Sequence, residues 1–326
     1  RVGLSEQTKW IVGIDGGGTK SLACLLNENG DLLGRMQCAA TNYQPQNIDA
    51  IVDEIKEAVA HLCRQAGHPD RKPDIVVACL SGLGREDARQ HVQNVLDAAD
   101  IGGKIITDSD AMAALYGAFS GRPGIIVIAG TGSIAFAKSA AGEILRCGGW
   151  GYLLGDEGSG FDIARRAITA ALKQWDGRGP TTSLRARLEA HFDVDSIEQA
   201  VTVIYGQYAT RGALAQCAPL VFQEAENSDE IALEIVTDAA EALAELALVL
   251  WHKIDSDGRT PVALLGKLFH NALLHANVVA QLNAQATQLQ IVRPDFPADI
   301  GAALLGLNRT LSPQAEKNLK NQLPGM

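Results

Sequence analysis

Two glycine-rich turns, each directly after an apolar strand, constrain this chain more than any other feature. The first lies in Trp10–Ser21 (WIVGIDGGGTKS) and the second in Ile125–Ser133 (IIVIAGTGS). In both copies a second apolar segment follows the turn, and a polar turn then leads to a third segment, which predicts two three-stranded meanders. One constant offset aligns both copies and places Gly18 on Gly130. The sequence therefore predicts a duplicated unit with one such turn in each half.

The two turns have the chemistry of phosphate-binding loops. Glycines let the backbone approach a ligand closely and present bare N–H groups, while Thr19 and Lys20 add a hydroxyl and a cation. Asp15, at the end of the first strand, suits a hydrated magnesium ion. A single turn of this kind could be a tight hairpin only, but its repetition favours a polyphosphate ligand. The predicted nucleotide-binding residues are Asp15, Gly16, Gly17, Gly18, Thr19 and Lys20 in the first turn and Gly130, Thr131, Gly132 and Ser133 in the second.

Length and composition narrow the class of protein. A chain of 326 residues with 47% hydrophobic residues predicts two domains with ample cores. The formal net charge is −10 and no basic run is present, which argues against nucleic acid or an anionic membrane as the main partner. The six cysteines are scattered and predict reduced core thiols. Because no signal peptide and no apolar run of bilayer length is visible, we expect a cytoplasmic protein.

The order of expected elements indicates the architecture. Strands come first in each half, and helices then cross between later strands, which predicts a three-layer α/β arrangement. One of the expected helices is Gly212–Glu226. We expect an N-terminal domain over 1–118, a C-terminal domain over 119–300, and a C-terminal helix over 301–326 that returns to the N-terminal domain.

The motifs also carry a family resemblance. Asp15–Lys20 and Ala129–Ser133 resemble the two phosphate motifs of the actin and sugar-kinase superfamily. Gly148–Gly151, followed by Gly155–Ser159, resembles more narrowly the N-acetylglucosamine kinase branch, which is grouped with the benzoyl-CoA reductase activator ATPases of the BadF/BadG/BcrA/BcrD type. The resemblance implies two actin/ribonuclease H-like domains with a nucleotide and sugar cleft between them. The N-terminal domain would carry the sugar side and the C-terminal domain the adenosine side.

The resemblance also implies an activity. It predicts an ATP- and Mg²⁺-dependent kinase that phosphorylates an amino sugar, first of all N-acetylglucosamine at its 6-hydroxyl. Kinases of glucosamine or N-acetylmuramic acid share most of these residues and remain alternatives. An ATPase that activates a reductase is an alternative of another class; its dimers share an iron–sulfur cluster, and here no closely spaced pair of cysteines is present. The expected partner is the small-molecule sugar, and the resemblance allows a homodimer.

A carboxylate must orient the acceptor hydroxyl and take its proton. The resemblance gives this role to an Asp at a strand-to-helix step that small residues follow, and Asp110 matches that position. Asp108 lies two residues earlier and stays open as a second carboxylate or a magnesium partner. Either could instead be an ordinary helix-start carboxylate.

The remaining roles are implied in the same way. Asn42 matches a sugar-binding asparagine, with an ordinary turn residue as the alternative. Trp150 matches a sugar contact, with a core anchor as the alternative. Asp156 matches a carboxylate that accepts sugar hydroxyls, and whether Glu157 shares in the chemistry is open. The sugar-binding residues so predicted are Asn42, Trp150, Gly151, Asp156 and Glu157, and the adenosine-side glycine turn is at Gly266.

Overall fold

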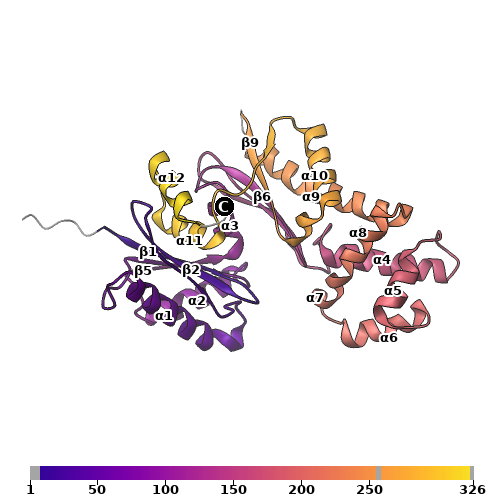
Figure 1. Ribbon diagram of the computed structural model, residues 1–326, viewed down its shortest axis with the longest axis horizontal. Helices are drawn as coiled ribbons and strands as arrows, with labels where there is room; N and C mark the ends of the chain where they lie inside the picture. The colour runs from indigo at the N-terminus through magenta and orange to yellow at the C-terminus, as the bar shows by residue number, and fades with distance from the viewer. Residues whose placement is uncertain (1–7, 255–257, 324–326) are drawn as a thin grey trace, which may run out of the picture. The chain divides into compact units, whose positions relative to one another are not determined.

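The computed structural model describes residues 8–254 and 258–323, so the ends of the expected first and last segments (1–7 and 324–326) lie outside the described residues. The chain forms two compact units, the first of residues 1–122 and 293–326 and the second of residues 123–292 (Figure 1). These boundaries differ from those expected at 118/119 and 300/301. The chain returns to the first unit before residue 301 because Phe296 and Ile300 are buried in its hydrophobic core.

The first unit is built on a five-stranded mixed sheet with the order β3-β2-β1-β4-β5. β1 pairs antiparallel with β2 and parallel with β4, and β5 continues parallel to β4. Along β1 the side chains alternate, so that Val12 and Ile14 pack on one face and Ile11 on the other. The strands are β1 (Trp10–Gly16), β2 (Ser21–Asn27), β3 (Leu32–Cys38), β4 (Ile75–Leu80) and β5 (Lys104–Ser109).

Helices cover both faces of this sheet (Figure 1). On one face lie α1 (Ile48–Gln65), entered through the 3-10 turn η1 (Pro45–Asn47), and α2 (Glu86–Ala98); on the other lie α3 (Asp110–Ala118), α11 (Ala298–Leu307) and α12 (Pro313–Gln322). The single helix expected over 301–326 is therefore wrong. α11 ends where Asn308 adopts a left-handed conformation, and Pro313 begins α12, a position that tolerates the missing proline N–H.

The sheet of the second unit repeats the first. Its order is β10-β9-β6-β7-β8, with β6–β7–β8 antiparallel and β9 and β10 parallel to β6. Strands β6, β7 and β8 thus correspond to β1, β2 and β3, so the predicted duplication is present in the topology. The strands are β6 (Gly124–Ala129), β7 (Ser133–Lys138), β8 (Ile144–Gly148), β9 (Thr260–Leu265) and β10 (Leu289–Ile291).

The second unit is rich in helices, and two features differ from expectation. The expected helix Gly212–Glu226 is broken, because Pro219 lacks a backbone N–H and is accommodated only in the first turn of a new helix. Helix α5 was not predicted. Among the described residues, no helix combines the length and apolar character needed to cross a bilayer. The helical elements are α4 (Gly160–Trp175), α5 (Leu184–Phe192), α6 (Ile197–Gln207), α7 (Arg211–Leu214), η2 (Ala215–Cys217), α8 (Ala218–Glu226), α9 (Glu230–Lys253), η3 (Lys267–His270) and α10 (Ala272–Gln285).

Within the first unit, α11 lies unusually close to its neighbours. A Cβ placed on Gly301 would stand 2.0 Å from the carbonyl oxygen of Ala113 and 2.5 Å from the backbone nitrogen of Gly117, both in α3. On the sheet side, a Cβ on Gly13 of β1 would stand 2.4 Å from the backbone nitrogen of Ala303 in α11. The absence of side chains at these glycines therefore allows α11 to pack between α3 and the sheet.

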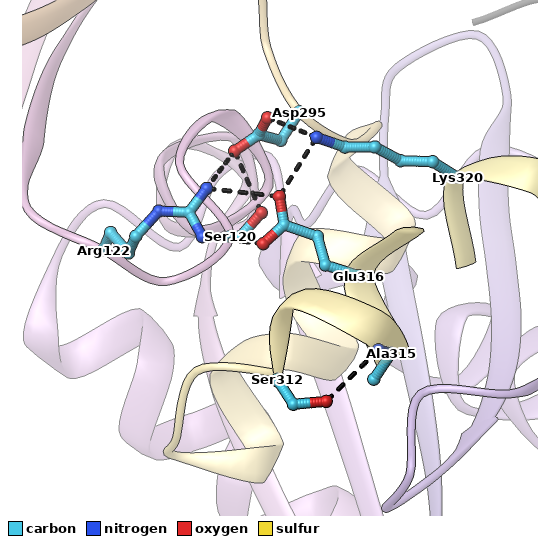
Figure 2. A network of polar contacts seen from close by, with 7 residues as sticks. All are labelled: Ser120, Arg122, Asp295, Ser312, Ala315, Glu316 and Lys320. Atoms are coloured by element: carbon cyan, nitrogen blue, oxygen red, sulfur yellow. Dashed lines mark hydrogen bonds and ion pairs between the residues drawn. The ribbon is translucent and has the colours of Figure 1, made fainter. Parts of the chain in front are cut away.

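The chain passes from the first unit to the second after residue 122 and returns at residue 293. A polar network holds residues next to both of these crossings to α12 (Figure 2). Arg122, the last residue before the first crossing, donates to Asp295 and to Glu316, in each case at 2.7 Å. Lys320 donates to the same two carboxylates at 2.7 and 3.0 Å, and the hydroxyl of Ser120 donates to Asp295 at 2.9 Å. Two cations thus bridge two carboxylates, and α12 is held to the chain on both sides of the second unit.

This network predicts a pH-dependent contribution to stability. The Arg122 and Lys320 cations lower the pKa of Glu316 from 4.5 to about 2. The stabilisation is therefore fully present above about pH 4.5 and is lost as the pH falls through about 2. We expect Glu316→Gln to reduce the free energy of unfolding by about 1–3 kcal/mol at neutral pH, because the partner cations are partly exposed to water and screened. The difference from the parent protein should shrink between pH 4.5 and 2 in urea titrations.

Glu57→Gln is the matched control for this prediction. Glu57 lies 3.9 Å from Arg64, and both side chains are more than half exposed, so the same substitution should change stability by less than about 0.5 kcal/mol. Equal effects of the two substitutions at all pH values would show that the network around Glu316 adds no stability.

Candidate active site

Two acidic residues lie at one edge of the first sheet because of strand register. Asp15 in β1 pairs with Cys79 in β4, which in turn pairs with Asp108 in β5. These strands are parallel, so their carboxyl ends meet at the same edge of the sheet. β5 ends at Ser109, and Asp110 follows it as the first residue of α3. The sequence-predicted base and magnesium residues are thus gathered on the first unit.

Asp15 is in an electrostatically unusual position. Burial is the largest cause that raises the pKa of its carboxyl, and the charges of Asp110 and Asp299 raise it further, to about 7. Within the described part of the chain no cation forms an ion pair with Asp15, whereas Asp299 is paired with Arg35 at 2.6 Å. A carboxyl group whose pKa is raised in this way, and which lies close to a second carboxylate, favours the binding of a positive charge.

Asp110 and Asp108 have different neighbours, and this helps to choose between them. The Asp110 carboxylate accepts the backbone N–H of Ala111 at 2.9 Å, and its pKa is raised by burial and lowered in part by this bond and by a hydrogen bond with the Ser81 side chain. The charge of Asp110 raises the pKa of Asp15, while Asp108 is not among the causes of that shift. Asp108 instead interacts with charges on α2. Of the two, Asp110 is thus the electrostatic neighbour of Asp15.

The loop that carries Asn42 is held beside the first glycine turn. The hydroxyls of Thr41 and Ser21 lie 2.8 Å apart, and a Cβ on Gly16 would stand 2.4 Å from the Thr41 hydroxyl. On the other side of Asn42, the backbone N–H of Tyr43 donates to the backbone carbonyl of Ser81 at 2.7 Å. Both flanks of Asn42 are therefore fixed near the carboxyl ends of β1 and β4. Asn42 thus belongs to the same edge of the sheet as Asp15 and Asp110.

The second glycine turn rests on the start of α4. The backbone N–H of Gly160 donates to the carbonyl of Gly130 at 2.8 Å, and the Ser133 hydroxyl donates to the carbonyl of Glu157 at 2.7 Å. Asp156 is 4% exposed and has a left-handed backbone (φ 61°), a conformation that costs free energy for a residue other than glycine. The sequence-predicted Asp156 and Glu157 thus lie beside the turn, the first buried and the second exposed.

Trp150 is at the surface of the second unit. Its side chain is 67% exposed, so the alternative of a core anchor is wrong. The guanidinium of Arg146 lies 4.6 Å from the centre of the Trp150 ring and also donates to the carbonyl of Gly148. Gly151, with φ of 86°, accepts the N–H groups of two later residues and turns the loop back. The indole is therefore backed by a cation on one side and available to a ligand on the other.

A cavity of about 660 Å³ opens next to the second turn. Gly130, Thr131 and Gly160 line one part of it, and the turn after β9 lines another. Gly266 begins that turn with φ of 101°, and a Cβ there would stand 2.2 Å from the carbonyl oxygen of Ala129. The sequence-predicted Gly266 thus lets the β9 turn approach the end of β6, and the residues after it reach the cavity.

Much of the cavity lining was missed by sequence reasoning. Helix α8 contributes Phe222, Gln223 and Glu226, and Asn271 faces them, with its amide 3.4 Å from the Glu226 carboxylate. The other lining side chains come from η2, the start of α8 and the β9 turn; they are Ala215, Gln216, Pro219, Lys267, Leu268 and His270. An aromatic and apolar wall with a few amides, next to a phosphate-type loop, suits a nucleoside.

The acidic group can be tested for its fit to magnesium. No group of three or more His, Cys, Asp or Glu side chains that could hold a metal ion is found among residues 8–254 and 258–323. Mg²⁺, however, keeps several waters and binds one or two carboxylates together with substrate phosphates. Asp15, unpaired with a cation in the described chain and close to Asp110, fits a hydrated Mg²⁺ that arrives with a nucleotide.

The chain matches a known protein family over most of its length. The model of the BadF/BadG/BcrA/BcrD ATPase family matches residues 12–306. The N-acetyl-D-glucosamine kinase of Dictyostelium discoideum is 30% identical over 313 residues, 91% of this chain and 98% of the relative. The N-acetylmuramic acid/N-acetylglucosamine kinase of Clostridium acetobutylicum is 30% identical over 235 residues, 72% of this chain and 77% of the relative.

A solved structure confirms the predicted fold class. The crystal structure of a candidate N-acetylglucosamine kinase from Chromobacterium violaceum has a TM-score of 0.69 and 28% identity, and the match covers 92% of this chain and 99% of that one. The matched family is the one that the two glycine turns and the Trp150 motif predicted from sequence. This chain belongs to the BadF/BadG/BcrA/BcrD ATPase family.

Proposed function

We propose that the protein is an ATP-dependent kinase that phosphorylates an amino sugar, with N-acetylglucosamine and its 6-hydroxyl as the favoured substrate and position. The observation that carries the proposal is the position of Asp110 beside Asp15, next to a glycine turn at the carboxyl ends of parallel strands. The names of the two 30% identical relatives, both kinases of N-acetylglucosamine, support the same class.

In the proposed reaction, Asp110 orients the acceptor hydroxyl and takes its proton. The hydrogen bonds from the Ala111 N–H and the Ser81 side chain favour its charged form, so the carboxylate can act as a base although burial raises its pKa. Asp15 would hold Mg²⁺, which, when bound, would neutralise charge on the nucleotide phosphates. The glycines of the first turn would present N–H groups to those phosphates.

The proposed sugar-binding side chains are Asn42, Trp150 and Asp156. Asn42 offers an amide from a loop that is fixed on both sides. Trp150 offers an exposed aromatic face suited to pyranose C–H groups, and Asp156 offers a carboxylate suited to sugar hydroxyls. The adenosine part of ATP would occupy the cavity lined by Phe222 and Asn271, with its phosphates at Gly130–Ser133.

The test is a panel of sugars with coupled detection of ADP. We expect N-acetylglucosamine to stimulate ATP consumption with Mg²⁺ present and to yield one sugar phosphate per ADP in air. Glucosamine and N-acetylmuramic acid in the same panel distinguish the alternative sugars. Hydrolysis of ATP that no sugar stimulates, together with an iron–sulfur chromophore after anaerobic purification, would instead identify a reductase activator.

A further inference from the structure

An arginine beside the second glycine turn has no part in the function described so far. Arg211 is the first residue of α7, and its Nη1 lies 3.9 Å from Oδ2 of Asp156. That same oxygen lies 2.8 Å from the point where a Cβ would stand on Gly132. The Arg211 guanidinium is therefore next to the turn that carries Gly130–Ser133.

The short helix α7 holds Arg211 at the edge of the cavity. Leu214 anchors the helix in the hydrophobic core of the second unit, while the Arg211 side chain is 55% exposed. Gly212, the next residue, lines the cavity together with Gly130 and Thr131. The backbone of Arg211 is thus fixed near the phosphate end of the cavity, and its partly exposed side chain is accessible to a ligand.

The pairing of Arg211 leaves its donors unused. At 3.9 Å the contact with Asp156 is an ion pair and not a hydrogen bond, and the guanidinium donates no hydrogen bond within the described structure. Asp156, 5% exposed at its side chain, supplies a buried negative charge that keeps the guanidinium in place. A guanidinium presents five N–H donors in a planar fork that matches phosphate oxygens.

We propose that Arg211 binds the terminal phosphates of the nucleotide at the second glycine turn, and that Asp156 positions its guanidinium. This inference rests on the proposed kinase function. Lys267, which lines the cavity near the β9 turn, is the competing cation.

The test compares a triphosphate with a nucleoside by calorimetry on the full chain. For Arg211→Gln we expect the dissociation constant of AMP-PNP to rise by about ten- to a hundredfold, because charge-assisted hydrogen bonds are lost. The affinity for adenosine should not change, since adenosine lacks phosphates. Arg211→Lys keeps the charge but loses the planar fork of donors, so its dissociation constant for AMP-PNP should lie between those of the parent protein and Arg211→Gln.

Arg165→Gln is the matched control. Arg165 lies in α4, is 54% exposed and pairs with Asp162 at 2.8 Å, so the substitution removes an equally exposed arginine and its ion pair from the same unit, and nucleotide binding should be unchanged. Equal loss of AMP-PNP and adenosine binding in Arg211→Gln would indicate a purely structural role and overturn the proposal. Parental affinity for both ligands, or selective loss of AMP-PNP in Lys267→Gln alone, would also overturn it. Failure of the parent protein to bind AMP-PNP would reject the kinase function as well.

Discussion

Asp110→Asn is expected to lower the turnover number by about 10²–10⁴-fold. The amide keeps the shape of the side chain and one acceptor oxygen, but it cannot take the proton of the sugar hydroxyl. The loss corresponds to about 3–5 kcal/mol of activation free energy. The KM for the sugar should change much less, because the proposed contacts through Asn42, Trp150 and Asp156 remain. Steady-state kinetics with coupled ADP detection measure both constants.

Asp108→Asn is the control for this prediction. It makes the same chemical change two residues earlier, at a carboxylate that interacts with Arg89 and Glu86 of α2 and is not among the causes of the Asp15 shift. We expect it to reduce turnover by less than about tenfold, outside the range of a lost general base. If Asp108→Asn abolishes turnover while Asp110→Asn retains it, the base is Asp108.

Gly301→Ala is expected to cost about 3 kcal/mol of unfolding free energy. The new methyl group would stand 2.0 Å from the Ala113 carbonyl oxygen and 2.5 Å from the Gly117 nitrogen. Because both are backbone atoms, no side chain can rotate away, and α11 must move from α3. Urea or thermal unfolding of the full chain measures the loss.

Gly206→Ala is the control, because the same substitution is expected to change the free energy of unfolding in the opposite direction. Gly206 lies in α6, and a Cβ there would meet no atom within 4 Å. Since alanine favours a helix over glycine by about 0.5–1 kcal/mol, this variant should be slightly more stable than the parent. If Gly301→Ala were as stable as Gly206→Ala, the close approach of α11 to α3 would not be required.

The sheets could be predicted from sequence because their signals are local. Apolar runs bounded by glycine-rich turns identify β1 and β6, and the constant offset between the copies identifies the duplication. The acidic edge follows from the same pattern, since the strand that carries Asp15 and the strand that carries Asp108 are parallel members of one sheet, with β4 between them. The short helix α5 also has a local sequence pattern, because Leu184, Leu188 and Phe192 recur at helical spacing. All three side chains are buried in the structure.

The cavity could not be predicted in this way, because tertiary packing forms it. Glu226 at the end of α8 and Asn271 at the start of α10 are brought to 3.4 Å by the fold of the whole second unit. The environment of Trp150 is a similar case, since a tryptophan between glycines reads the same whether it is buried or 67% exposed. The packing of α11 depends on Gly13 and Gly301, which are far apart in sequence.

The insertion of the second unit into the first has a consequence for biosynthesis. The face of the first sheet that carries Ile11, Cys24 and Val77 is covered by α11, whose residues lie on the far side of residues 123–292. At about 5–20 residues per second, a ribosome needs roughly ten to thirty seconds to make that intervening segment. The second unit is continuous and can fold as it emerges, whereas the first keeps an apolar face uncovered until α11 has left the exit tunnel. The nascent chain is therefore most prone to aggregate, and most in need of a chaperone, in this interval.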